Sequence, residues 1–248
     1  MQFLIKIDPR DTVKPISPSQ SCIGIDVGLK YFYADSQGSI IENPRFYRSS
    51  EKQLNYANRL KSRKFVRGQK QSNNYLKARK RYAKKHLKVS RQREEFAKVH
   101  ALRLIQSNDL IVCEELNIKG LVKNRHLSKS TKALAACSDV AWSKFRRWLE
   151  YFGDKYGKLV VAVPPHYTSV KCSRCGNKVK KTLSTRTHVC SCGYTADRDT
   201  NAAINILQLG LSRVGRTLTN AWGDLSSSLV GEILSGYDGS LNQESPSF

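Results

Sequence analysis

Three acidic residues stand at positions where an exposed surface residue is not expected. Asp26 follows the apolar stretch Cys-Ile-Gly-Ile, Glu114 ends the apolar run 110–113, and Asp199 opens a helical segment. Burying three carboxylates together is tolerable only if cations neutralise them. Oxygen ligands of this kind suit Mg²⁺ or Mn²⁺, and two such ions about 4 Å apart can hold the attacking and leaving oxygens of a phosphodiester. The set therefore indicates metal-dependent phosphodiester hydrolysis.

Each of these acids also has a purely structural explanation. Asp26 could start a turn, Glu114 could lie at the wet edge of a strand, and Asp197 or Asp199 could cap a helix. Taken singly, the structural explanation is favoured for each. The order in which the acids occur, after two hairpins, at the end of a buried strand and at the head of a helix, favours one shared centre.

Four cysteines form a second constellation, Cys172-Ser-Arg-Cys175-Gly and Cys190-Ser-Cys192-Gly, with fourteen residues between the two pairs. Two short turns joined by a hairpin can offer four thiolates to a tetrahedral Zn²⁺. The glycine after each pair permits the tight turn that points both sulfurs inward. Because protein would fill all four positions, we expect one structural zinc; the alternative is a chance cluster of free thiols.

The other three cysteines and the first residues of the chain help to predict the cellular compartment. Cys22, Cys113 and Cys137 lie among apolar residues and are predicted to be core residues. No apolar run approaches the roughly 20 residues that span a bilayer, and the first residues lack the pattern of a secretory signal. These features predict a cytoplasmic protein with no membrane partner, in which clustered cysteines bind metal.

The charge of the chain predicts a polyanionic partner. Lys and Arg number 43 against 20 Asp and Glu, a formal net charge of +23, which favours nucleic acid over the alternative of a merely basic or ribosome-associated protein. Residues 51–100 hold 17 of the basic residues and are predicted to form a helical hairpin broken around 68–74. The predicted phosphate contacts are Arg63, Lys64, Arg67, Lys70, Lys77, Arg79, Lys80, Arg81, Lys84 and Lys85.

The elements that must position these groups can be read from hydrophobic periodicity. Strands are predicted at 22–27, 31–34 and near Ile40, then at 109–114 and 158–163, the last stopped by Pro164-Pro165. Amphipathic helices are predicted at 140–156 and at about 199–209. This order predicts an α/β chain with an RNase H-like fold, a helical insertion at about 51–106 and an inserted zinc ribbon.

The segments GIDVGLK, IVCEELNIKGL, YTSVKCSRCG and CGYTADRDTNAAINIL resemble the RuvC-like nuclease half of the TnpB (OrfB) family, in order, over about residues 22–210. These are transposon-encoded, RNA-guided endonucleases related to the type V CRISPR effectors. The resemblance implies that Asp26, Glu114 and Asp199 are the catalytic acids. It also implies that the four cysteines are zinc-ribbon ligands, and that DNA, a guide RNA and a full-length relative or transposase are partners.

The resemblance also suggests a division of the chain. Residues 1–21 would be the remnant of an N-terminal β module, 22–168 the RuvC-like domain, 169–198 the zinc ribbon and 199–222 the last helix of the nuclease domain. Residues 223–248 would be an acidic, disordered tail. Since family members carry many more residues before the GIDVG block, the chain is expected to be an N-terminally truncated member.

Three functions compete. The first is a divalent-metal-dependent endodeoxyribonuclease. The second is a non-catalytic nucleic-acid-binding form that assists a full-length relative or transposition. The third, a zinc-ribbon protein of transcription or the ribosome, leaves the three acids as coincidence and ranks last.

Overall fold

The computed structural model describes residues 16, 19, 21–115, 142–182 and 185–220. The predicted N-terminal remnant (1–21) and acidic tail (223–248) lie almost wholly outside the described residues, and so does Cys137. In the part of the chain that is described, no helix combines the length and apolar character needed to cross a membrane.

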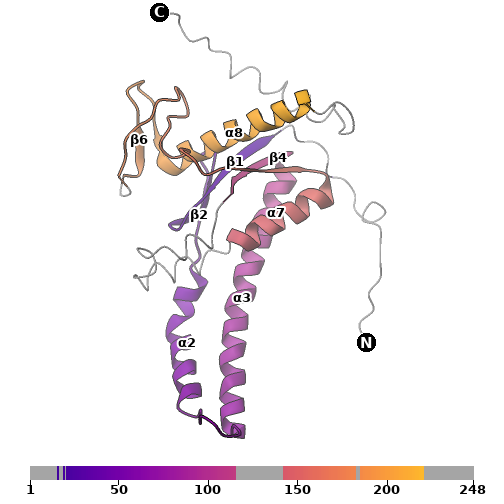
Figure 1. Cartoon of the computed structure of the whole chain (residues 1–248), viewed down its shortest axis with the longest axis vertical. Helices are drawn as coiled ribbons and strands as arrows, with labels where there is room; N and C mark the ends of the chain where they lie inside the picture. Colours follow the sequence, from indigo (N-terminus) through magenta and orange to yellow (C-terminus); the bar gives the residue numbers. More distant parts are fainter. Residues whose placement is uncertain (1–15, 17–18, 20, 116–141, 183–184, 221–248) are drawn as a thin grey trace, which may run out of the picture.

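A five-stranded mixed sheet in the order β3-β2-β1-β4-β5 forms the centre of the protein (Figure 1). β1 (Cys22–Val27), β2 (Tyr31–Asp35) and β3 (Ile40–Glu42) form the predicted antiparallel meander. β4 (Leu110–Glu114) and β5 (Leu159–Val163) continue the sheet parallel to β1. The four strands predicted with bounds are confirmed to within one residue at each end, and a strand lies near Ile40 as predicted. β4 and β5 are buried or half-buried along almost their whole length, as expected of strands covered on both faces.

The two faces of the sheet carry different helices because side chains alternate along each strand. Ile23 and Ile25 of β1, with Ile111 and Cys113 of β4, face a core formed with α3 (Asn73–Ser107) and α7 (Trp142–Tyr156). The intervening residues, among them Cys22, Leu110 and Val112, face α8 (Arg198–Asn220). Figure 1 shows α8 on one side of the sheet and α3 with α7 on the other.

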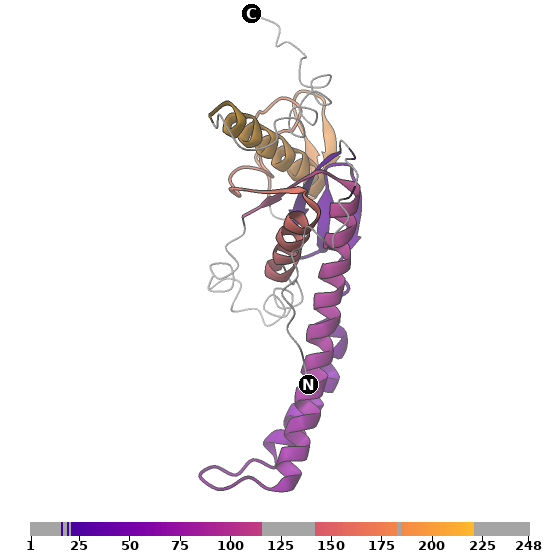
Figure 2. The ribbon, with the colours of Figure 1, turned by 90° about the vertical axis from the view of Figure 1, so that its right-hand side faces the viewer.

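The predicted basic hairpin is α2 (Phe46–Ser62) followed by α3. The break falls at residues 63–72, slightly before the predicted 68–74, because the side chain of Ser72 accepts a hydrogen bond from the backbone N–H of Tyr75 and so caps α3. The C-terminal part of α3 packs against the sheet through Ala97, Ala101 and Ile105. Its N-terminal part runs beside α2 as an arm that projects from the body (Figure 2).

α8 runs from Arg198 to Asn220, past the amphipathic stretch predicted at about 199–209 and close to the bounds 199–222 given above for the last helix. A glycine often follows a helix end. Here Gly210 lies inside the helix, and a Cβ at this position would approach Val112 to 2.3 Å. The glycine therefore serves close packing of α8 on β4 rather than termination.

A buried ion pair joins the ends of β4 and β5 that lie opposite the candidate site. Lys158 donates to Asp109, and the two side chains are only 3% and 1% exposed. Asp109 also accepts a hydrogen bond from the backbone N–H of Ser19 at 2.8 Å. Paired and hydrogen-bonded in this way, the two charges can remain buried.

Candidate functional site

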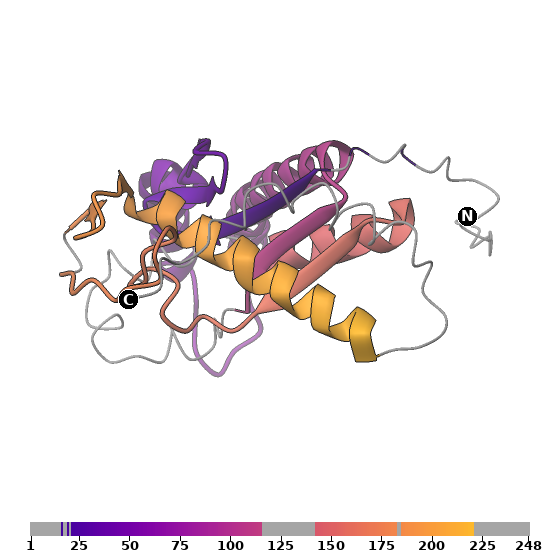
Figure 3. The same ribbon diagram turned by 90° about the horizontal axis from the view of Figure 1, so that it is seen from above.

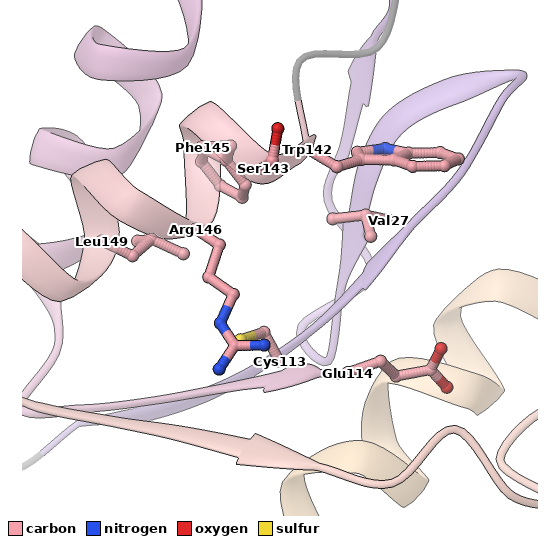
Figure 4. A pocket seen from close by; sticks show the side chains of 8 residues that line it. All are labelled: Val27, Cys113, Glu114, Trp142, Ser143, Phe145, Arg146 and Leu149. Atoms are coloured by element: carbon pink, nitrogen blue, oxygen red, sulfur yellow. The ribbon is translucent and has the colours of Figure 1, made fainter. Parts of the chain in front are cut away.

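Asp26 and Glu114 lie side by side because β1 and β4 are adjacent parallel strands. Ile25 is paired with Cys113 in the register, so the next residue of each strand is one of the two acids. Both acids belong to the set of alternate positions that faces α8, and the Glu114 carboxylate points toward that helix (Figure 4). The carboxyl ends of two parallel strands thus deliver two half-buried carboxylates to one edge of the sheet.

α8 approaches this edge closely because the strand beneath it carries a glycine. A Cβ on Gly24 would lie 2.2 Å from the carbonyl oxygen of Ala203 and 2.8 Å from Cβ of Leu207. Real Cβ atoms do not approach other atoms this closely, so only glycine permits the observed distance between β1 and α8. α8, which carries Asp199 in its first turn, therefore packs directly on β1, and Figure 3 shows the helix running across the sheet.

Asp199 faces two arginines, whereas Asp197 caps the first turn of α8. The guanidinium Nε of Arg198 lies 3.2 Å and Nη1 of Arg186 lies 3.6 Å from the Asp199 carboxylate, whose side chain is 15% exposed. Asp197 accepts a hydrogen bond from the backbone N–H of Asp199 at 2.8 Å and thereby caps the first turn. The capping role distinguishes Asp197 from Asp199, which remains directed at the cations.

The electrostatic properties of Asp26 show that the three acids interact. Burial raises the pKa of Asp26 well above its usual range, and the carboxylates of Glu114 and Asp199 raise it further, whereas Arg198 lowers it. A carboxyl group that is buried among like charges favours its protonated form unless additional positive charge is supplied. The structure therefore brings the predicted Asp26, Glu114 and Asp199 into one electrostatic cluster that a divalent cation would relieve.

Glu114 is oriented by a hydroxyl group that the sequence did not single out. Burial raises the pKa of Glu114, while the hydrogen bond that Thr168 donates to its carboxylate lowers it. Thr168 is only 5% exposed, and its carbonyl oxygen in turn accepts from the side-chain amide of Asn205 at 2.7 Å. Thr168 thus links the acid of β4 to α8.

Two buried asparagines of α8 hold the segment that carries Thr168 and the first cysteines. Asn201 accepts from the backbone N–H of Ser173 at 3.0 Å and donates to the carbonyl of Lys171 at 2.8 Å. Asn205 donates to that same carbonyl at 2.9 Å. Both lie on the buried, otherwise apolar face of α8, four residues apart, and that spacing was the available signal for their role.

A small apolar pocket adjoins Glu114 on the opposite face of the sheet (Figure 4). Its walls include Val27 of β1 and Trp142, Phe145 and Leu149 of α7. The volume is about 40 Å³, so the pocket offers little room for a ligand. Arg146 reaches along its side and pairs with Glu150 at 2.8 Å, which fixes the guanidinium near the end of β4.

The four predicted zinc ligands converge. The sulfur atoms of Cys172, Cys175, Cys190 and Cys192 all lie within 4.8 Å of one another, with separations of 3.8 Å for Cys172–Cys192 and 3.5 Å for Cys175–Cys190. A tetrahedral ion with Zn–S bonds of about 2.3 Å requires sulfurs about 3.8 Å apart, so the cluster fits Zn²⁺. Among the described residues, these cysteines are the one compact group of metal-ligating side chains, and the three carboxylates are held less closely.

The backbone around the cysteines is built for this convergence. Gly176 and Gly193 adopt positive φ angles of 75° and 82°, and the N–H of each donates to the carbonyl of the first cysteine of its pair. β6 (Thr187–Val189) and β7 (Thr195–Asp197) form the small hairpin that presents the second pair. The glycines and hairpin confirm the knuckle geometry that the spacing predicted.

Ionisation of the thiols differs within the cluster. The backbone N–H of Cys192 lowers the pKa of Cys190 to about 6, so that one thiolate is available at neutral pH. The N–H of Asn177 favours the Cys175 thiolate, yet burial and the other cysteines raise the pKa of Cys175 to about 12. One thiol ionises first and its charge opposes loss of the next proton, a conflict that a bound cation removes.

Cys22 and Cys113 are core residues, as expected. Both side chains are buried, and burial raises the pKa of each thiol to about 11. A thiol in this state is a poor nucleophile and a poor metal ligand at neutral pH.

The ten basic residues predicted to contact phosphates lie on the projecting arm, and all are exposed except the half-buried Lys85. Four of them gather on a groove of about 320 Å³ between α2 and α3, which Tyr56 and Leu60 also line; they are Lys64, Lys77, Arg81 and Lys85. No carboxylate lines the described walls of this groove. The remaining predicted contacts are distributed over other faces of the arm.

Comparisons with known proteins give two family matches. Residues 2–125 match the OrfB_IS605 family, described as "Probable transposase", and residues 142–206 match "Cas12f1-like, TNB domain". The chain is similar to a "Putative RNA-guided DNA endonuclease" of Streptomyces pristinaespiralis, with 36% identity over 85% of this chain. It is also similar to InsQ of Escherichia coli, which bears the same description, with 30% identity over 79% of this chain. The chain spans about half the length of these relatives, 50% of each.

The fold also has a solved counterpart. The structure "Cryo-EM structure of the Cas12f1-sgRNA-target DNA complex" contains a chain that superposes with a TM-score of 0.51 at 17% identity. The match covers 78% of this chain and 51% of the other. At this identity the likeness concerns the fold alone.

Proposed function

The chain belongs to the OrfB family of probable transposases, which includes the TnpB-like proteins, and from that premise we propose that it is a divalent-metal-dependent endodeoxyribonuclease with a RuvC-like centre. The proposed catalytic residues are Asp26, Glu114 and Asp199. The proposed fold is RNase H-like, because a three-stranded antiparallel meander is followed by two parallel strands and a helix that crosses the sheet. The nuclease domain would comprise 22–168 and 199–222, with the zinc ribbon at 169–198 between them.

One arrangement carries the proposal: Asp26 lies near the end of β1 beside Glu114 at the end of the adjacent strand β4, and α8, which begins with Asp199 in its first turn, packs closely on β1. Burial raises the pKa of Asp26 most, and the carboxylates of Glu114 and Asp199 raise it further. Carboxylates that are clustered and partly buried repel one another and lose hydration, so neutral side chains of the same size would stabilise the fold better. The cluster is therefore better explained by function than by stability. Oxygen donors that are hard, anionic and close to solvent fit Mg²⁺ or Mn²⁺. We propose two such ions, which when bound would supply charge neutralisation for the attacking and leaving oxygens of a DNA phosphodiester.

The chain's own residues contribute positioning and charge in this proposal. Glu114 is held in one orientation by the hydroxyl of Thr168, so its carboxylate need not reorganise on binding. Arg186 and Arg198 lie against Asp199, and their positive charge would attract a phosphate once a divalent cation binds that carboxylate.

The zinc ribbon would act through structure rather than chemistry. All four positions of a tetrahedral ion would be filled by cysteine, which leaves no position for water or substrate. The ribbon is tied to the centre because the segment between Thr168 and Cys172 is held by Asn201 and Asn205 of α8. One bound Zn²⁺ would therefore stabilise the entry of α8 and, through it, the location of Asp199.

The proposed partners are DNA and a guide RNA. Relatives described as RNA-guided DNA endonucleases motivate both, and the basic arm supplies phosphate-binding surface with the contacts named above. Because the chain spans half of those relatives, guided cleavage is proposed for the whole protein of this type, with the metal centre as the part that this chain supplies.

The test is cleavage of labelled single-stranded DNA by the purified chain in Mg²⁺ or Mn²⁺. We expect metal-dependent cleavage that Asp26→Asn abolishes and Asp154→Asn, an exposed acid on α7, leaves intact. Cleavage that survives Asp26→Asn at the wild-type rate would exclude the proposed centre.

A second function also needs a direct test, because the chain spans only half the length of its relatives. A chain that covers half of its relatives yet retains the basic arm could bind nucleic acid without cutting it and assist a full-length relative. RNA or DNA that copurifies, with an affinity that falls steeply with salt and no cleavage in any divalent metal, would favour this alternative.

A further inference from the structure

A second candidate nucleic-acid surface lies on the face of α7 that is turned away from Glu114. Trp142, Phe145 and Leu149 occupy one side of the helix and pack toward the sheet. Lys144, Arg147, Trp148 and Tyr151 occupy the opposite side, since helical residues three and four apart share a face. With Glu94 of α3 they line a hollow of about 420 Å³.

Two aromatic rings form a corner in this hollow. Tyr151 meets Trp148 at 88° with ring centroids 5.5 Å apart, and the Tyr151 side chain is 50% exposed. Behind the indole lies the buried ring of Phe152, nearly parallel to it at 26° and 5.5 Å. Because Phe152 is fixed in the core, the indole is held as a stiff wall rather than as a mobile surface side chain.

An ammonium group lies over the indole ring. Nζ of Lys98 lies 5.2 Å from the ring centroid, within the roughly 6 Å of a favourable cation–π contact. A planar group that entered the hollow could take this place and release Lys98 to a nearby anion. Nucleobases stack on aromatic side chains in this manner, and cations beside such platforms neutralise the adjacent phosphates.

The charges around the hollow favour a negatively charged ligand. Lys144 donates to Glu94 at 2.8 Å and lowers the pKa of that carboxyl, and Arg147 and Lys98 lower it further. Three cations therefore converge on one carboxylate, which leaves positive charge in excess. A cationic or neutral apolar guest would face this excess, whereas a phosphodiester would be attracted.

We infer that the corner formed by Trp148 and Tyr151 stacks an unpaired nucleotide, with Lys98, Lys144 and Arg147 on the flanking phosphates. The inference rests on the proposed function only in taking nucleic acid as the partner. The surface is separate from the basic groove on the arm, and it is suited to a single strand because a paired base cannot leave its stack without cost. Single-stranded DNA and single-stranded RNA share this chemistry.

The test is equilibrium binding of fluorescent oligomers of dT and of U, roughly 12 nucleotides long, to the full chain without divalent metal. Matched abasic oligomers of the same length report the phosphate contribution alone. Tyr151→Ala should weaken binding of a base-bearing oligomer by about 5- to 100-fold, the range of one lost stack. It should leave the abasic oligomer unchanged, and Tyr151→Phe should retain binding because the ring remains.

A second measurement does not depend on truncating Tyr151. Trp148 is one of three tryptophans in the chain, so a variant with Trp142→Phe and Trp222→Phe reports Trp148 alone. Its emission should be quenched by a base-bearing oligomer and unaffected by an abasic one. Comparing the quenching by dT oligomers with that by U oligomers shows whether the hollow prefers single-stranded DNA or single-stranded RNA.

Two results would overturn the inference. One is Trp148 emission that does not respond to any bound oligomer. The other is Tyr151→Ala with unchanged oligomer affinity but a lost self-association, which would assign the hollow to a second copy of the chain. Neither result concerns cleavage, so failure here is distinguishable from failure of the nuclease proposal, which is measured with Asp26→Asn in divalent metal.

Discussion

Gly24→Ala tests whether close packing of α8 on β1 positions the candidate centre. The added methyl carbon would lie 2.2 Å from the carbonyl oxygen of Ala203, and real Cβ contacts do not fall below 3.0 Å. The helix backbone must therefore retreat by about 1 Å, because neither a strand in mid-sheet nor a helix carbonyl can yield as a side chain tip does. The retreat carries Asp199 away from Asp26.

The expected losses follow from that displacement. Overpacking of this kind costs about 1–3 kcal/mol of unfolding free energy. For a chain of this size the cost lowers the melting temperature by roughly 2–12 °C. A misplacement of about 1 Å at a catalytic centre can reduce the rate about 100-fold. Thermal unfolding by circular dichroism and cleavage of labelled DNA in Mn²⁺, both at temperatures where the variant is folded, measure the two effects.

Gly28→Ala is the matched control. It lies two residues after Asp26, but its added methyl would meet only the carbonyl of Tyr31 at 3.4 Å, an ordinary contact. We expect the control to retain melting temperature and cleavage rate. If Gly24→Ala behaves like Gly28→Ala in both assays, the argument that α8 must approach β1 this closely is refuted.

Three further predictions concern zinc, pH and salt. Replacing one zinc ligand, Cys190→Ser, should lower the zinc content by about one Zn²⁺ per chain, as measured by mass spectrometry. The segment that carries Thr168 should then loosen and show faster amide hydrogen exchange. Unchanged zinc content would contradict the four-cysteine site. Burial and like charges raise the pKa of Asp26, so the stability of the metal-free protein should fall as pH rises from the unfolded-state value of about 4 to the raised pKa of the folded state, and should not fall further on this account above it. Asp26→Asn should therefore raise the melting temperature near pH 7 and lose this advantage below about pH 4. An equal gain at both pH values would contradict the cause given. Replacing Lys77 and Arg81 with Ala should weaken binding to DNA of any sequence and reduce the slope of log affinity against log salt by about 0.7–0.9 per lost contact; an unchanged slope would remove the groove from the interface.

Much of the fold was predictable because its elements are bounded by strong local signals. Short apolar runs ended by an acid or by Pro164 defined the strands, and hydrophobic periodicity defined α7. The paired cysteines with their glycines predicted the knuckles, since that spacing has few other uses. Asp26 and Glu114 were predicted to share one centre from their places at strand ends, and the parallel pairing of β1 with β4 is what the structure adds.

What could not be predicted depends on contacts between distant segments. The role of Gly210 inside α8 could not be predicted, because the packing of α8 on Val112 is not visible in local sequence. Thr168 could not be assigned to Glu114 without knowing where the first knuckle lies. Asn201 and Asn205 did carry a signal, two amides on an apolar helix face, but their partners are backbone groups that sequence does not specify. The hollow beside Trp148 likewise arises only when α7 packs on α3.

The most direct test of the central claim is binding of Mn²⁺ to the isolated chain, followed by electron paramagnetic resonance in the presence of an uncleavable single-stranded oligomer. The account predicts that Asp26→Asn, Glu114→Gln and Asp199→Asn each weaken Mn²⁺ binding by about tenfold or more, whereas Asp154→Asn leaves it unchanged. Wild-type Mn²⁺ affinity in all three variants would contradict a shared metal centre at these carboxylates.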